Sequence, residues 1–275
     1  MRNKKNFIFA FFLIFVFVSY ASAEGFQIGI HAQGTVDEAE FNHTVRNSWK
    51  WTAFKEDHSQ EDKYVFHDSL NAMQMALSAG KIKEIDVPEI VGEYMIAVNP
   101  DYEISCVMRC HYEIEFVFGF LRDERGFELQ EKFNDAIAFL KVEGKLDEII
   151  KNYTKDQEIM SLKPVEFENF EGAETIKIAI TGDMPPIDFI SVDGKAAGFN
   201  AAILSEIAKY LEVNIELVNI HTDARTANLT SGRTDAVFWY MRETGPIKYD
   251  IPEEVIISNP YYSWDTFVHV RLKNK

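Results

Sequence analysis

The sequence of 275 residues is short of the residues and motifs that mark metal sites and catalytic centres. Its seven histidines are scattered along the chain and form no metal-ligand spacing. We find no nucleophile elbow, no P-loop and no HExxH pair in it. No motif therefore specifies catalysis, and we expect a protein that is not an enzyme and that holds no metal and no cofactor.

Basic residues are also scarce. The chain carries 28 Lys and Arg against 44 Asp and Glu, which gives a formal net charge of −16 at pH 7. Nucleic acids and anionic membrane surfaces are bound through basic patches, so neither is an expected partner. Beyond the amino terminus the sequence has no second long apolar run, which predicts a soluble mature protein that does not insert into the membrane.

One long apolar run does occur, at the amino terminus. Three basic residues among the first five precede the segment 7–20, and 21-ASA-23 is a small-x-small cleavage signal. These features predict a secretory signal peptide over residues 1–23 and a periplasmic protein. The alternative is a membrane anchor, but a run of about 14 residues is shorter than the roughly 20 that span a bilayer. No cysteine follows the run, so a lipid anchor is not expected.

The only two cysteines, Cys106 and Cys110, are four residues apart. If they lie on one strand, they are about 13 Å apart, beyond the ~7 Å Cα separation that a disulfide tolerates. A turn or helix would permit the bond. The strand interpretation favours free thiols.

Hydrophobic periodicity predicts alternating strands and helices, and therefore an α/β fold with largely parallel sheets. Residues 155–175 have no clean periodicity and contain Pro164 and Gly172, so we interpret them as a linker. We expect strands over 26–30, 64–66, 82–89, 113–121, 176–180, 214–218, 235–239 and 264–270. We expect helices over 36–47, 70–79, 90–98, 128–153 with a break at Gly144, 199–211 and 223–231.

Two segments resemble the type 2 periplasmic solute-binding proteins of ABC importers, the amino-acid-binding family in particular. Residues 176–218, beginning IKIAITGDMPPIDF, resemble the segment that opens the family chain. Residues 128–153, ELQEKFNDAIAFLKVEGKLDEIIKNY, resemble the segment that closes it. The two stand here in the reverse of the family order, which implies a circular permutation.

Further segments extend the resemblance to both lobes of the family fold. The sequences 229-LTSGRTDAV-237 and 258-SNPYY-262 are similar to its first lobe, and 28-IGIHAQGTV-36 to its second. The resemblance implies two α/β lobes joined by two crossing strands, with a ligand cleft between them. Lobe 2 is expected over 24–112, completed by 264–275, and lobe 1 over 113–263, with linker 155–175 joining the family's usual termini.

The resemblance also implies where the ligand binds. Gln33 and Thr35 stand just before a helix whose N–H groups are placed to bind an anion, although Thr35 also fits a plain N-cap. The family's arginine, twelve residues after Asp235, is Ile247 here, so we expect Arg242 to replace it; the alternative is a solvated loop arginine.

The family's amine-binding aspartate, eight residues after Gly80, is Pro88 here, which leaves Asp86 or Glu89 as the candidate. Phe189, Trp239 and Tyr240 are candidate apolar or stacking walls, and the alternative is that they belong to the core. The predicted ligand-binding residues are Gln33, Thr35, Asp86, Glu89, Asp183, Phe189, Trp239, Tyr240, Arg242 and Thr244.

The resemblance implies an extracytoplasmic protein that captures a small polar solute, an amino acid or a relative of one, by hinge closure. It would deliver the solute to the membrane permease of an ABC importer. One alternative is a ligand-sensing or orphan binding module, and another is a periplasmic dehydratase-like enzyme. A monomer is expected, with a domain-swapped dimer as the alternative.

Overall fold

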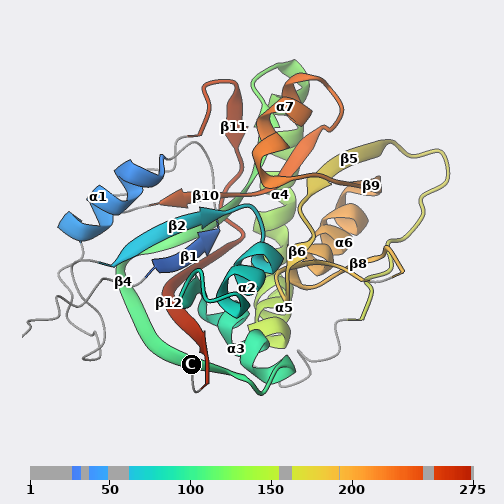
Figure 1. Ribbon diagram of the computed structural model, residues 1–275. Coiled ribbons are helices and arrows are strands. Elements are labelled where there is room, and N and C mark those ends of the chain that lie inside the picture. Colours follow the sequence, from blue (N-terminus) through green and yellow to red (C-terminus); the bar gives the residue numbers. More distant parts are fainter. Residues whose placement is uncertain are drawn as a thin grey trace, which may run out of the picture.

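The computed structural model describes residues 27–31, 37–48, 62–154, 163–191, 193–243 and 251–273 (Figure 1). The predicted signal peptide and the predicted site residues Gln33, Thr35 and Thr244 lie outside these ranges. Within them, no helix is both long enough and apolar enough to cross a membrane.

The described residues form one mixed sheet of nine strands and a small sheet of three. The large sheet has the order β2-β1-β3-β12-β4-β10-β5-β9, with β11 paired to β4, and the small one the order β6-β7-β8. The α/β class expected from the sequence is confirmed. The expectation of largely parallel sheets is wrong, because four of the eight strand pairings in the large sheet are antiparallel, all of them involving the crossing strands β4 and β12. The strands of the large sheet are β1 (Gln27–His31), β2 (Lys63–His67), β3 (Glu84–Pro88), β4 (Tyr102–Leu121), β5 (Thr175–Ile180), β9 (Asn214–Asn219), β10 (Ala236–Glu243), β11 (Val255–Ile257) and β12 (Tyr262–Leu272); those of the small sheet are β6 (Asp183–Met184), β7 (Asp188–Ile190) and β8 (Ala196–Ala197).

Two long antiparallel strands, β4 and β12, join the two flanks of the large sheet. On one flank lie the parallel strands β1, β2 and β3, and on the other β5, β9 and β10. Segments from opposite ends of the chain thereby become neighbours, since His269 of β12 pairs with Asp86 of β3.

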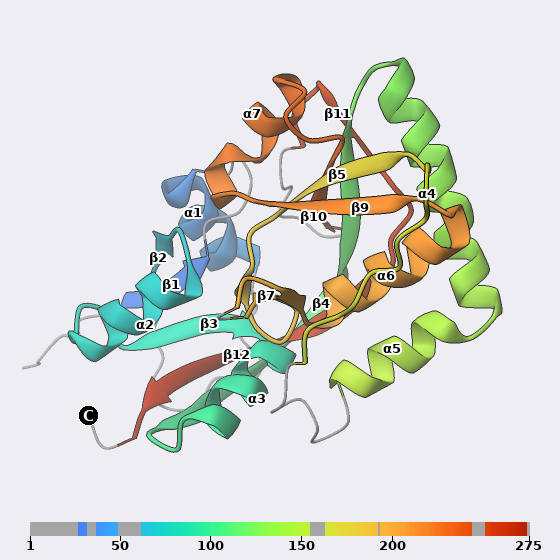
Figure 2. The same cartoon turned by 90° about the vertical axis from the view of Figure 1, so that its right-hand side faces the viewer.

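The helices divide between the same two flanks (Figure 2). We call β1–β3 with α1, α2 and α3 the first half, and β5, β9, β10 and the small sheet β6–β8 with α4, α5, α6 and α7 the second half, since α6 packs against β7 and β8. The helices are α1 (Glu38–Ser48), α2 (Leu70–Ser78), α3 (Glu89–Val98), α4 (Glu124–Val142), α5 (Lys145–Thr154), α6 (Phe199–Leu211), the 3-10 helix η2 (Thr222–Ala224) and α7 (Arg225–Thr230).

The core lies on both faces of the sheet because strand residues alternate between them. On β4, the fully buried Phe116, Phe118 and Phe120 belong to a large cluster with α4 and α6. Val117 instead belongs to a smaller cluster with Leu229 of α7. The crossing strand β4 is therefore packed on both sides.

Most expected elements are present, and the differences have local causes. Ser69 accepts a hydrogen bond from Ala72 N and begins α2, and Gly144, at φ +69°, separates α4 from α5. α4 begins earlier than expected because Asp123 caps it through Gly126 N. The short strands β6 and β11 were not predicted, since two or three residues carry no periodicity.

The strand expected over 113–121 is the second part of β4, which also contains both cysteines. The extended backbone there agrees with the strand interpretation of the Cys106–Cys110 segment, in which a disulfide does not fit. The Cys106 thiol is buried. The expected linker is irregular where it is described, apart from a bridge between Pro164 and Ala197.

Candidate functional site

The two halves touch through His31 at the end of β1 and Asp183 in β6. His31 Nε2 lies 3.7 Å from Asp183 Oδ2, and the His31 side chain is 4% exposed. Burial alone would raise the pKa of Asp183, but the contact with His31 and the charge of that ring outweigh burial and lower the pKa. The predicted site residue Asp183 therefore lies at a closed contact between the halves.

A buried charged group lies behind this contact in the second half. The guanidinium of Arg225, at the start of α7, lies 6.0 Å from the ring centre of the predicted site residue Tyr240. Asp188 accepts hydrogen bonds from Thr181 N, Thr181 Oγ1 and Gly182 N at 2.9–3.0 Å. Burial raises the pKa of Asp188 in spite of these bonds. No sequence pattern marked Arg225 or Asp188, because single polar residues in a short helix and a hairpin follow no periodicity.

Arg242 points to a carboxylate of the protein itself. Its Nε and Nη2 atoms both lie 2.5 Å from Glu115 Oε2, across the β10–β4 pairing. Its role as a ligand anchor stays a prediction. Phe189 is half-buried in the β6–β7 hairpin opposite Asp183, and the side chain of Trp239 is outside the described set.

The alternative amine partners Asp86 and Glu89 are placed in different surroundings. Asp86 is 4% exposed inside the first half, where it pairs in register with His269. Burial raises its pKa to about 7, with a further increase from the charge of Glu84 that is opposed by His269. Glu89 is exposed at the start of α3 and lines a cavity. Of the two, Glu89 is placed to meet a solute.

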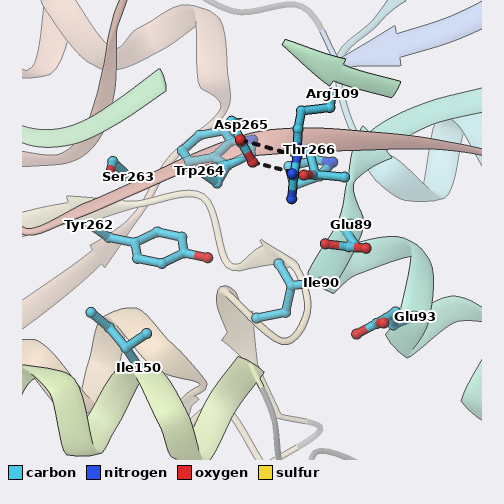
Figure 3. A pocket seen from close by; sticks show the side chains of 11 residues that line it. Glu89, Ile90, Glu93, Arg109, Ile150, Tyr262, Ser263, Trp264, Asp265 and Thr266 are labelled. Atoms are coloured by element: carbon cyan, nitrogen blue, oxygen red, sulfur yellow. Dashed lines mark hydrogen bonds and ion pairs between the residues drawn. The ribbon is translucent and has the colours of Figure 1, made fainter. Parts of the chain in front are cut away.

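This cavity has a volume of about 320 Å³ and lies beside the crossing strands (Figure 3). It combines the start of α3 from the first half, α5 from the second half, and both β4 and β12. α5 packs against α6, so a molecule in the cavity would contact both halves. The lining residues are Pro88, Glu89, Ile90, Glu93, Arg109, Ile150, Tyr262, Ser263, Trp264, Asp265 and Thr266.

The cavity is acidic and has aromatic walls. Burial raises the pKa of Glu93, and the nearby charge of Glu89 raises it further. Burial and the same Glu89 charge raise the pKa of Tyr262 to about 12. The rings of Tyr262 and Trp264 are stacked, with centres 6.0 Å apart. Arg109 Nε lies 3.3 Å from Asp265 Oδ2.

These groups are suited to binding a polar solute, since the acids accept hydrogen bonds and the rings supply flat apolar faces. In the part of the chain that the structure describes, no group of three or more His, Cys, Asp or Glu is arranged to hold a metal ion. Of the ten predicted site residues, Glu89 lines this cavity, and Asp183 and Tyr240 lie instead near the contact between the halves.

Residues 176–275 match the family model of the bacterial extracellular solute-binding proteins, family 3. No curated protein matches the sequence. Among solved structures, the ligand-binding component of an ABC-type import system from Staphylococcus aureus, with zinc bound, shares 9% identity at a TM-score of 0.45. That alignment covers 90% of this chain and 66% of the other.

Two further structures are similar at the same level. A periplasmic substrate-binding protein of an ABC transporter from Coxiella burnetii shares 10% identity at a TM-score of 0.42, over 88% of this chain and 84% of the other. The periplasmic aliphatic sulphonate binding protein SsuA from Escherichia coli shares 9% identity at a TM-score of 0.39, over 91% and 62%. The chain thus spans less than two thirds of the length of the S. aureus and E. coli proteins.

Proposed function

We infer that this chain is a bacterial extracellular solute-binding protein, of the family whose model its residues 176–275 match. We propose that it captures a small polar solute and delivers it to the membrane permease of an ABC importer. The family match carries this inference. The cavity between the two halves supports it, because a solute there would lie against both.

The proposed mechanism is closure of the halves around the solute. β4 and β12 both run from one half to the other, so a small change in their twist would move α3 relative to α5. A solute that contacts both helices binds the closed arrangement better than the open one. It therefore shifts the population towards closure by that difference in binding free energy.

The proposed lobes follow the sequence expectation: 24–112 with 264–275, and 113–263. The permuted order is supported by the connection between α5 and β5, which joins two elements of the same half. The signal peptide, the amino-acid specificity and the monomeric state stay predictions.

A thermal-shift screen of the exported chain tests the proposed function. Amino acids, amines, organic acids and sugars are added one at a time, with buffer of matched ionic strength as the control. A solute at about 100 times its Kd adds roughly 2.7 kcal/mol to the free energy of unfolding, which is a readily measured rise in Tm. The proposal is wrong if no small solute raises the Tm.

A further inference from the structure

We propose that the cavity beside β12 binds an organic cation without a carboxylate group, held between Glu89 and Glu93 and against the rings of Tyr262 and Trp264. This inference rests on the proposed function and names the class of solute. The cavity, at about 320 Å³, is at the lower end of the range for small-molecule sites. A small amine or quaternary ammonium ion is of suitable size.

The two glutamates supply the charge. Glu89 and Glu93 are one helical turn apart on α3, a spacing that places side chains on the same face about 5–6 Å apart. Figure 3 shows both carboxyl groups projecting from α3 towards the cavity. Among the described residues no basic side chain forms an ion pair with either. Burial and the charge of Glu89 raise the pKa of Glu93, and a bound cation would relieve that repulsion.

The two aromatic residues supply a face for the cation. Tyr262 and Trp264 are two residues apart on β12, a spacing that places side chains on the same face of a strand. Their rings are stacked and inclined to each other by only 17°. Phe116, the register partner of Tyr262 on β4, packs against both, with its ring centre 5.7 Å from that of Tyr262 and 4.0 Å from that of Trp264. A cation within about 6 Å of such a ring is attracted by its electron-rich face. Because Phe116 is fully buried, the wall is held in place before a solute arrives.

The charges also disfavour a carboxylate on the solute. Arg109 is the one basic side chain among the described residues that line the cavity, and its guanidinium already faces Asp265. A solute carboxylate would meet Glu89 and Glu93 without a free cation to offset the repulsion. Amines are therefore expected to bind more tightly than the corresponding zwitterions.

Three probes of nearly equal shape separate these charge states. Choline is a cation, 3,3-dimethylbutan-1-ol is its uncharged isostere, and glycine betaine carries the same ammonium group with a carboxylate. Titration calorimetry on the exported chain at pH 7.5 should give a Kd for choline at least tenfold lower than for the other two. Putrescine, titrated in parallel, tests whether a primary amine is preferred to a quaternary one.

Matched variants locate the effect. Glu89→Gln combined with Glu93→Gln should weaken cation binding tenfold or more, whereas Glu131→Gln, an exposed residue of α4, should leave it unchanged. Tyr262→Phe keeps an aromatic face and should retain affinity, whereas Tyr262→Leu should lose about fivefold.

Three results would overturn the inference. If betaine, another carboxylate or an uncharged solute binds and neither cation does, the assignment of the solute class is wrong but the solute-binding function stands. The same holds if a cation binds equally well to the double glutamine variant. If no solute of any class binds, the proposed function falls together with the inference.

Discussion

Replacing Asp86 with asparagine should stabilise the protein above pH 7 and flatten the pH dependence of its stability. Burial raises the pKa of this carboxyl from 3.8 to about 7 in the folded protein. The folded chain therefore keeps a proton that the unfolded chain releases between these values. By linkage, the free energy of unfolding falls as pH rises through this window. Above the window, the folded protein bears the full free-energy cost of holding the ionised Asp86 carboxylate in a buried position.

The surroundings of Asp86 explain why its ionisation is costly. Glu84 lies on the same strand, and its Oε2 atom shares a hydrogen bond of 2.9 Å with His269 Nδ1. The His269 ring is therefore engaged with the Glu84 carboxyl. Tyr64 of β2, Cys106 of β4 and Asp62 complete the buried group. Asp86 Oδ1 has no hydrogen-bond partner among the described residues. A neutral amide of the same shape avoids burying this charge.

Urea unfolding from pH 4 to pH 8 measures the effect. We expect Asp86→Asn to exceed the parent by about 2–4 kcal/mol at pH 8 and by little at pH 4. The exposed Asp135→Asn on α4 is the control and should follow the parent at every pH. A variant that is less stable than the parent at pH 8 would show that the ionised carboxyl stabilises the fold.

Truncating Phe116 to alanine should lower the free energy of unfolding by about 3–5 kcal/mol. The side chain is fully buried on β4, where it packs against Tyr261, Tyr262 and Trp264 of the chain that leads into and forms β12. Its removal leaves a void where the two crossing strands meet. It also removes a ring that packs against Tyr262 and Trp264 of the aromatic wall of the cavity, so solute affinity should fall as well.

Phe127→Ala is the matched control for this truncation. Phe127 lies on α4 and is 51% exposed, so the same change of side chain should cost less than about 1 kcal/mol. Urea denaturation of both variants gives the comparison. Equal losses for the two would mean that packing between β4 and β12 does not hold the halves together.

Local structure was predictable from the sequence because its causes are local. The helix 199–211 was predicted with its observed bounds, since its apolar residues recur every four positions on one face. Gly144 ended a helix where expected, because glycine readily adopts the left-handed conformation there. The length of β4 was not predicted, because it depends on pairing with β12 and β10, which come more than a hundred residues later.

The site was harder to predict because partners come from distant segments. The sequence singled out Arg242 without indicating that Glu115, 127 residues earlier, faces it in the sheet. The sequence made Asp86 and Glu89 alternative candidates for the amine partner. The fold distinguishes them, because Asp86 is buried in a strand and Glu89 is exposed at the start of a helix and lines the cavity. A strand over 264–270 was predicted, but Tyr262 precedes its expected start, and nothing local marked the rings of Tyr262 and Trp264 as walls of a cavity.

We propose that the two ends of the chain build one solute-binding molecule in permuted order. Gln27 O accepts a hydrogen bond from Lys83 N, and on the other side of β3 the β12 residue Val270 pairs with Ile85. The start of β1 and the end of β12 are therefore two strand spacings apart, about 10 Å. If residue 275 were joined directly to residue 24, six residues (273–275 and 24–26) would lie between these two ends, and six residues of extended chain are long enough to span about 10 Å.

The most direct test is a rearranged chain that begins at residue 163, runs to 275, continues directly into residue 24 and ends at residue 162. It restores the order of segments that the resemblance implies. We predict that it folds cooperatively and binds the solute found in the screen with a Kd within about threefold of the parent's. A rearranged chain that folds but does not bind the solute, or that yields two independent unfolding transitions, would contradict the account.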